Sequence, residues 1–403
     1  MRYGSDWISC IKCNIFPHKY REFSQTVKGY FRRPGMKKRA VAILTAACMS
    51  AGVLTGCSGT GGGIVSADDS SDNSDYHFMV IVKSYQSTYW QAAIQGIVEA
   101  EEELEAEIDI TGPNTESEIG EQVYMLDYAI SQEPDGIILA ANDQNAVLES
   151  LRDARDAGIP VVCFDTGVPE APEGSVVATV ATDNDAAGAM AAENMYKVIR
   201  DHVKEAEAQV RICEVNQDSS SANITARGMG FIRKMKELLE ADGKSVAVVG
   251  DQYYAGQIES SENEKTADVV IETVVPMQTT VELSAEAVGE IMRKEDTIAV
   301  FGSNQVTAEG ILAADEELNV LASSPEDGIV GVGFDAGFTV KTAVADGTLI
   351  GAVAQAPGDQ GSLAVQVLYA YCEGEEVQDI ETDSFWYDAG NINDSHIAPK
   401  LYD

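Results

Sequence analysis

Most of the chain alternates short apolar runs with longer amphipathic segments. FMVIV at 78–82 predicts a buried strand, and the apolar residues of 88–104 recur on one face, which predicts a helix. The same unit repeats as GIILA at 136–140, a helix over 144–157 and IPVVCF at 159–164. Continuous apolar strands that alternate with helices are typical of parallel sheets covered on both faces.

A second series of predicted strands and helices begins at VVATV (176–180). It continues as helix 184–201, strand 210–215, helix 222–241, strands 245–250, 269–275 and 297–302, helix 305–316, strand 328–334, helix 336–346, strand 350–354 and helix 358–372. The stretch 251–283 is less regular and predicts a surface excursion at about 255–267. The two series predict an α/β protein with two doubly wound lobes, in which ligands bind at the carboxyl ends of the strands.

The first 75 residues follow a different pattern. MKKRAVAILTAACMSAGVLTGCSG, at 36–59, places three basic residues before an apolar run and small residues after it, as a secretory signal does. The apolar run (40–54) is shorter than the about 20 residues that span a bilayer. The Gly, Ser and Asp of 58–75 leave little to bury and predict a flexible linker.

The end of this signal, Leu54-Thr55-Gly56-Cys57, resembles the lipobox of bacterial lipoproteins. The resemblance implies that the chain is cut before Cys57, whose sulfur receives a diacylglycerol that holds the protein at a membrane surface. Since a signal peptide sits at an N-terminus, we expect translation to start at Met36. The regions expected before the folded part are an extension that is not translated (1–35), a signal peptide (36–56) and a linker (57–75).

The composition limits the possible partners. The chain has 27 basic and 66 acidic residues, a formal net charge of −39, and removal of residues 1–56, with 10 basic and 2 acidic residues, leaves it near −47. Such a surface repels phosphate backbones, so we expect no nucleic-acid binding. Cys163, Cys213 and Cys372 are expected to be buried free thiols.

Polar and aromatic residues follow the predicted strands, where a doubly wound fold places its ligand. They are Ser87, Tyr89, Trp90, Asn142, Asp143, Asp165, Thr166, Asn304, Asp335 and Gln355, with Arg227 near the start of a helix. Carboxylates and amides satisfy the hydroxyls of a polyol, aromatic faces cover a sugar ring, and a guanidinium offers a fork of donors. Structural roles stay open: the aromatic pair as helix core, the aspartates as caps, the arginine in a surface ion pair. Asn142 and Asp143 are expected to form a turn.

Several segments are similar to the ribose/galactose type of periplasmic binding protein, whose ligand-binding core is shared with LacI-type regulators. They are VATDNDAAGAMAAENM (180–195), ANITARGMGF (222–231), AVFGSNQ (299–305) and GIVGVGFDAGFTVKTAVADGTLIGAVAQAPGDQG (328–361). The resemblance implies an N-terminal lobe (76–181 plus 356–384) and a C-terminal lobe (182–355 plus 385–403), joined by three crossover segments and closing on a sugar by hinge bending. The ligand contacts that it implies are Ser87, Tyr89, Trp90, Asp165, Arg227, Asn304, Asp335 and Gln355.

The sequence departs from the ribose binders at three positions. Those proteins usually have Asn where this chain has Ala140, Arg where it has Thr166, and often Asn where it has Ser87. The departures remove hydrogen-bonding groups from the N-terminal lobe's side of the cleft. We therefore do not expect ribose to be the ligand.

The resemblance and the lipobox together imply a lipid-anchored, extracytoplasmic solute-binding component of an ABC importer. It would deliver a monosaccharide or related polyol to a membrane permease with its cytoplasmic ATPase, without a cofactor, a metal or a catalytic residue. A sensor subunit for a membrane receptor is the alternative. A surface glycosidase would need Asp165 and Asp335 as a catalytic pair, and the sequence has no H-E-x-x-H, G-x-S-x-G or P-loop motif. A LacI-type regulator would need a basic helix-turn-helix, which the N-terminal sequence lacks.

Overall fold

The computed structural model describes residues 76–402 of the chain. The predicted extension, signal peptide, linker and lipidation site at Cys57 lie outside the described residues. Residues Ser74–Asp403 form one compact unit by contacts among themselves. Its strands form two mainly parallel sheets, which confirms the predicted α/β fold with two lobes. Between residues 76 and 402, no helix combines the length and the apolarity that crossing a bilayer requires.

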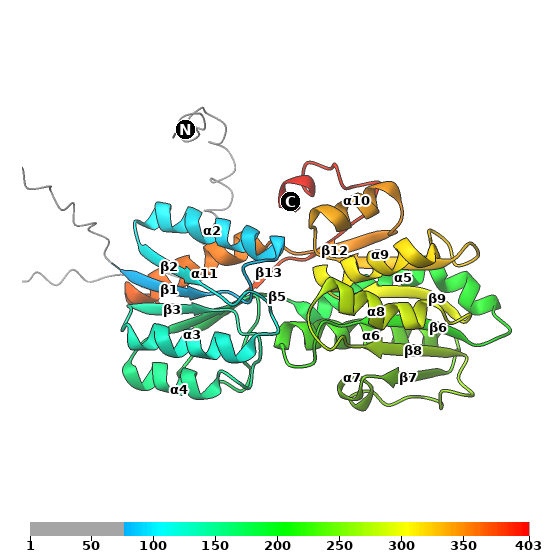
Figure 1. Ribbon diagram of the computed structural model, residues 1–403, viewed down its shortest axis with the longest axis horizontal. Helices are drawn as coiled ribbons and strands as arrows, with labels where there is room; N and C mark the ends of the chain where they lie inside the picture. Colours follow the sequence, from blue (N-terminus) through cyan, green and yellow to red (C-terminus); the bar gives the residue numbers. More distant parts are fainter. Residues whose placement is uncertain (1–75, 403) are drawn as a thin grey trace, which may run out of the picture. The chain divides into compact units, whose positions relative to one another are not determined.

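The first sheet is parallel throughout, with the strand order β13-β5-β4-β3-β1-β2. Its strands are β1 (His77–Ile81), β2 (Glu107–Thr111), β3 (Gly136–Leu139), β4 (Val161–Phe164), β5 (Ala178–Thr182) and β13 (Ile380–Thr382). Figure 1 shows one pair of helices on each face: α2 (Thr88–Leu104) with α11 (Pro357–Cys372), and α3 (Ile119–Ser131) with α4 (Leu148–Ala157). We call this sheet and its four helices the first lobe.

The second sheet has the order β14-β12-β11-β9-β6-β8-β7, with β10 beside β11 and β14 antiparallel to β12. Its strands are β6 (Val210–Val215), β7 (Val246–Gly250), β8 (Val269–Val274), β9 (Thr297–Gly302), β10 (Leu321–Ala322), β11 (Ile329–Phe334), β12 (Gly351–Ala354) and β14 (Phe385–Tyr387). The helices of this second lobe are α5 (Asn184–Glu205), α6 (Ala222–Ala241), α7 (Gln252–Gly256), α8 (Val281–Met292), α9 (Gln305–Leu318), α10 (Phe338–Asp346) and the 3₁₀ turn η1 (Ala398–Lys400).

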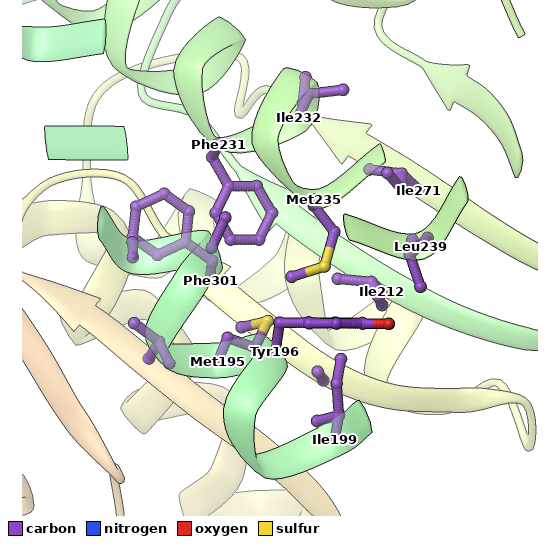
Figure 2. Close-up of a cluster of buried hydrophobic side chains, with 14 of the residues drawn as sticks. Met195, Tyr196, Ile199, Ile212, Phe231, Ile232, Met235, Leu239, Ile271 and Phe301 are labelled. Carbon is purple, nitrogen blue, oxygen red and sulfur yellow. The ribbon is translucent and has the colours of Figure 1, made fainter. Parts of the chain in front are cut away.

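The largest core of the second lobe lies between its sheet and the helix pair α5 and α6. Figure 2 shows the apolar side chains of both helices pointing toward those of the strands, with Phe231 of α6 stacked on Phe301 of β9 at 4.5 Å between ring centroids. Burying each large apolar side chain contributes about 1.5–3 kcal/mol. The residues labelled in this core are Met195, Tyr196, Ile199, Ile212, Phe231, Ile232, Met235, Leu239, Ile271 and Phe301.

Most predicted elements are present. The differences are a shifted helix start and several elements that the sequence pattern did not predict. The helices over 88–104 and 222–241 have the predicted bounds, whereas α4 begins at Leu148 because 144–147 form a turn. No element was predicted at β2, α3 or α8, nor at the short elements α7, β10, β13, β14 and η1. β2 is an edge strand with alternating exposed residues, so it lacks a continuous apolar run. Cys163 and Cys213 are buried free thiols, whereas Cys372 is only half-buried.

The chain passes between the two sheets three times: from β5 to α5, from β12 to α11, and from β13 to β14. Side chains at these passages bond to one another. The Thr182 hydroxyl donates to Gln355 Oε1 (2.8 Å), and Gln360 Nε2 donates to the hydroxyls of Thr182 (2.8 Å) and Thr382 (3.1 Å). Polar bonds of this kind, rather than a shared apolar core, join the three passages.

Glycines allow the close approach of the helix pair α2 and α11. A Cβ on Gly96 of α2 would lie 1.9 Å from the carbonyl oxygen of Gly358, and one on Gly361 of α11 would lie 2.4 Å from that of Ala93. Backbone atoms cannot move aside as a flexible side chain can. The contact between these helices therefore requires glycine.

The variant Gly96→Ala should lower the free energy of unfolding by about 1–3 kcal/mol, because the added methyl group overpacks the helix contact. Gly120→Ala is the matched control, since Gly120 of α3 is exposed and a Cβ there would meet no atom within 4 Å. It should leave stability unchanged or raise it by about 0.5–1 kcal/mol. Urea unfolding of both variants measures the difference, and equal stability of the two would contradict the close contact.

Candidate functional site

A pocket lies where the carboxyl ends of the strands of both sheets meet. The cavity measures about 20 Å³, room for about one water molecule, so in this arrangement the side chains that line it nearly fill it. All eight candidate ligand contacts from the sequence line it: Ser87, Tyr89, Trp90, Asp165, Arg227, Asn304, Asp335 and Gln355. The structure adds seven residues that were not predicted: Lys83, Glu116, Gln217, Asn223, Ile224, Gln305 and Val306.

Asp165 and Asp335 occupy equivalent positions in the two lobes. Asp165 follows β4 and Asp335 follows β11, and each donates its backbone N–H to the neighbouring strand, to Val180 O (2.9 Å) and Val353 O (2.7 Å) respectively. Both then turn with positive φ, 62° and 68°. Left-handed backbone is costly for a residue other than glycine and occurs often at functional sites. The turn ends each strand with a buried carboxylate at the pocket.

The carboxylate of Asp165 accepts two hydrogen bonds and forms one ion pair. The Tyr89 hydroxyl donates to Oδ1 (2.6 Å), Asn223 Nδ2 donates to Oδ2 (2.8 Å), and the Lys83 ammonium lies 3.3 Å from Oδ2. Lys83 also donates to Ser221 Oγ (2.7 Å) and Asn223 Oδ1 (3.0 Å) of the second lobe. A buried charge persists only with such partners, so Asp165 is a paired carboxylate and not a simple cap.

The Asp335 carboxylate accepts two N–H groups, from Gln355 Nε2 (3.0 Å) and from the backbone of Gln305 (3.2 Å). Burial raises its pKa to about 6, and the nearby Arg227 guanidinium partly opposes that rise. The carboxyl group thus keeps lone pairs for a further donor in the pocket.

Arg227 is buried, which rules out the surface ion pair considered from the sequence. Its Nη1 donates to the Ser303 carbonyl (2.7 Å), its Nη2 donates to Asn184 Oδ1 (2.7 Å), and its guanidinium lies 3.7 Å from the centroid of the Phe334 ring. The planar group is therefore held rigidly at the wall of the pocket.

Tyr89 and Trp90 combine the two roles considered from the sequence, because they are buried in the first lobe and also line the pocket. Their rings lie nearly perpendicular, at 81° and 5.1 Å between centroids. The Trp90 indole N–H donates to Glu116 Oε1 (2.8 Å). The two rings thus have fixed orientations.

Glu116 links the two lobes beside the pocket. Its Oε2 accepts from Gln217 Nε2 (2.7 Å) of the second lobe, and Gln217 Oε1 accepts from Asn304 Nδ2. Burial raises the pKa of the Glu116 carboxyl. A continuous chain of hydrogen bonds therefore runs from the Trp90 ring in one lobe to Asn304 in the other.

The residues that the sequence analysis missed differ in how easily they could have been found. Lys83 and Gln217 lie two residues after β1 and β6, so considering the residues after every strand would have included them. Asn223 is in the first turn of a predicted helix. Glu116 lies on the loop before α3, a helix that was not predicted, so no sequence signal placed it at the pocket.

The structure shows what surrounds the three positions at which the sequence departs from the ribose binders. Ser87 is the N-cap of α2, where its hydroxyl accepts the Tyr89 N–H (3.2 Å), and it also lines the pocket. The Thr166 hydroxyl accepts the Asn223 N–H (3.2 Å) across the lobes. The pocket wall of the first lobe carries Lys83 and Glu116, so this side of the site has charged groups although Ala140 offers none.

Asn142 and Asp143 have different roles: one is a buried polar residue and the other forms a turn. Asp143 forms the expected turn, with its carboxylate accepting the N–H groups of Asn145 (2.7 Å) and Ala146 (3.0 Å). Asn142 is buried, and its Nδ2 donates to the Lys83 carbonyl (3.3 Å). Neither residue is among those that line the pocket.

Glu214 is a buried carboxyl near the end of β6 and is not among the residues that line the pocket. Its partners are the Thr273 hydroxyl (3.0 Å) and Asn216 Nδ2, and burial raises its pKa to about 8. The folded protein therefore keeps a proton that the unfolded chain releases between about pH 4.5 and 8. Stability contributed by this group falls as the pH rises through that interval.

Glu214→Gln should flatten the fall of unfolding free energy between pH 6 and 8. The loss attributable to Glu214 is at most about 1.4 kcal/mol for each pH unit, and the neutral amide removes it without a change of shape. Exposed Glu259→Gln is the control and should keep the wild-type slope. Urea unfolding at pH 6, 7 and 8 tests this, and parallel curves for wild type and Glu214→Gln would contradict the assignment.

Comparison with known proteins assigns the family. Residues 78–376 match the family described as periplasmic binding protein domain. The chain is 23% identical over 343 residues to the ribose import binding protein RbsB of Bacillus subtilis (strain 168), covering 85% of this chain and 96% of that protein. A stretch of 78 residues is 28% identical to the ABC transporter periplasmic-binding protein YphF of Escherichia coli (strain K12), and covers 19% of this chain and 24% of that protein.

A solved structure agrees with this assignment. An ABC transporter solute-binding protein from Agrobacterium vitis with bound D-fucose has a TM-score of 0.66 and 25% identity, covering 81% of this chain and 100% of that chain. The TM-score shows that the chain shares the fold of that solved structure. The chain therefore belongs to the periplasmic binding protein domain family, whose members bind solutes and are not enzymes.

Proposed function

We propose that this protein is the lipid-anchored, extracytoplasmic solute-binding component of an ABC importer. Its ligand is a monosaccharide or a related polyol, held in the pocket between the lobes by Ser87, Tyr89, Trp90, Asp165, Arg227, Asn304, Asp335 and Gln355. It delivers this ligand to a membrane permease that works with a cytoplasmic ATPase.

The observation that carries the proposal is the pair of equivalent aspartates facing one pocket beside fixed aromatic rings. A polyol presents hydroxyl groups that both donate and accept, and Asp165 and Asp335 offer strong acceptors from opposite sides. The rings of Tyr89 and Trp90 offer apolar surface for the C–H face of a sugar. Arg227 and the amides supply donors for the remaining oxygens.

The positions of the three passages support the proposed division into an N-terminal lobe (76–181 plus 356–384) and a C-terminal lobe (182–355 plus 385–403). Strands β1 to β5 and β13 form the first sheet, and the remaining strands form the second. β5 ends at Thr182, one residue beyond the proposed boundary. Bending at the passages would open the pocket. Closure would surround the ligand with groups from both lobes.

The relatives' names and the N-terminal sequence support import at a membrane surface. RbsB is named as an import binding protein and YphF as an ABC transporter protein. Diacylglycerol at Cys57 and the linker that follows would keep the binding unit close to its permease.

Ribose itself is not our preferred ligand. Lys83 and Glu116 add ionisable groups to the first lobe's wall of the pocket, while Ala140 and Thr166 are departures from the ribose binders in the same lobe. We propose a different pentose or hexose, or a polyol, whose oxygens match this altered wall.

A sugar screen on residues 74–403 tests the ligand class. Pentoses, hexoses and polyols, with D-fucose and D-ribose among them, are added while thermal unfolding and tryptophan fluorescence are followed. A ligand at about 100 times its Kd should add roughly 2.7 kcal/mol of stability. Asp335→Asn should then weaken binding by about 1.5–3 kcal/mol, since a charged acceptor is lost.

Asp143→Asn is the matched control for that variant, because Asp143 also follows a strand but lies outside the pocket. It should bind the sugar as the wild type does. A folded protein that responds to no sugar or polyol would count against the ligand class. Equal affinities of Asp335→Asn and the wild type would remove Asp335 from the binding site.

Lipidation at Cys57 is tested separately, with the full chain expressed in a bacterial host. Wild-type protein should incorporate labelled fatty acid and sediment with membranes, whereas Cys57→Ser should do neither, because it lacks the sulfur that is acylated. Cys48→Ser, within the signal, should behave as the wild type. Labelling that persists in Cys57→Ser would exclude the proposed lipidation site.

A further inference from the structure

The segment that follows β14 returns to the pocket. After Tyr387 it turns through residues 388–397, forms η1 and reaches Tyr402, beside α10 (Figure 1). Ile392, Ile397 and Leu401 pack on the buried cluster around α10 and β12. We call residues 388–402 the return segment. It is held on the second lobe by its own apolar contacts.

Tyr402 of the return segment contacts residues of both lobes. Its hydroxyl accepts the Ala336 N–H (3.3 Å) next to Asp335 and lies 3.1 Å from Gln305 Oε1. Its ring meets the pocket residue Tyr89 of the first lobe edge to face, at 75° and 6.0 Å between centroids. Burial raises the pKa of its hydroxyl, which stays a neutral donor.

The Tyr402 hydroxyl and the Glu309 carboxylate together fix the orientation of the Gln305 amide. Since the hydroxyl oxygen accepts from Ala336, its proton is available to Gln305 Oε1. The amide nitrogen is then directed to the other side, where Nε2 donates to Glu309 (2.9 Å) and to the hydroxyl of Thr88 (2.8 Å). The reversed amide would place its oxygen against the Glu309 carboxylate.

The oriented amide connects three parts of the site. Thr88 begins α2 of the first lobe, so the bond from Gln305 to Thr88 crosses between the lobes. The backbone N–H of Gln305 donates to the Asp335 carboxylate (3.2 Å). Gln305 therefore contacts both an interlobe partner, through its side chain, and a pocket carboxylate, through its backbone.

We infer that Tyr402 is a positioning residue of the binding site, which holds Gln305 in the bridge to Thr88 and so favours the closed arrangement of the lobes. The inference rests on the proposed function for its ligand. Ligand affinity depends on the fraction of molecules that are closed, because only that state surrounds the ligand from both sides. The return segment thereby raises the affinity for the ligand although it does not line the pocket.

Tyr402→Phe is the primary test, since it removes the hydroxyl and keeps the ring against Tyr89. In residues 74–403, without sugar, X-ray scattering should show a larger radius of gyration than for the wild type. Affinity for whichever of D-fucose and D-ribose binds should fall about 5- to 10-fold, the loss of one hydrogen bond. Tyr76→Phe is the control: its hydroxyl bonds Glu373 (2.8 Å), away from the pocket.

A double-mutant cycle separates positioning from a general structural effect. The Tyr402 and Thr88 hydroxyls act through the same Gln305 amide, so Tyr402→Phe should cost little further affinity in a Thr88→Val background. Gln305→Met removes the bridge from its centre and should reproduce the scattering change of Tyr402→Phe. It serves as the second variant if Tyr402→Phe fails to fold.

The outcomes distinguish this inference from the proposed function. If neither sugar binds, the affinity measurements use the ligand found in the wider screen, and the scattering of wild type and Tyr402→Phe still decides on closure. A shift in scattering for Tyr402→Phe and Gln305→Met, absent in Tyr76→Phe, supports the bridge. Coincident curves for wild type, Tyr402→Phe and Gln305→Met, or additive affinity losses in the cycle, would overturn it.

Discussion

The need to satisfy two buried carboxylates shapes the site of this protein. Asp165 and Asp335 end equivalent strands in left-handed turns, and an unpaired charge at either place would cost several kcal/mol. The partners of Asp165 are Lys83 and Tyr89 of the first lobe and Asn223 of the second. The neutralising contacts therefore cross the pocket, and the same groups that stabilise the aspartates position the lobes.

Many contacts between the lobes are hydrogen bonds, and this matters for a protein that must open. Each lobe has its own apolar core, whereas the three passages are joined by hydroxyl and amide bonds around Gln360. A protein hydrogen bond contributes only about 0.5–1.5 kcal/mol net, because water replaces it on opening. A ligand that adds a few hydrogen bonds can then shift the balance between the open and the closed arrangement.

Most of the fold could be predicted from the sequence, and the elements that were missed have weaker sequence patterns. Buried parallel strands such as β3 and β9 are continuous apolar runs, so their pattern is strong. The edge strand β2 and the helices α3 and α8 were missed. The same gap hid Glu116, whose loop precedes α3. Lys83 was missed for another reason: a lysine after a strand gives no sign of whether it is solvated or buried against a carboxylate.

The sequence by itself determined the two α/β lobes and the strand-end positions of the candidate contacts, because periodicity and strand ends are local properties of the chain. Tertiary structure decided which distant groups pair: Lys83 with Asp165, Glu116 with Gln217, and Tyr402 with Gln305, separated by 82, 101 and 97 positions. Such pairings depend on how two sheets face each other across three passages. That arrangement is a global property of the packed chain, which no local pattern encodes.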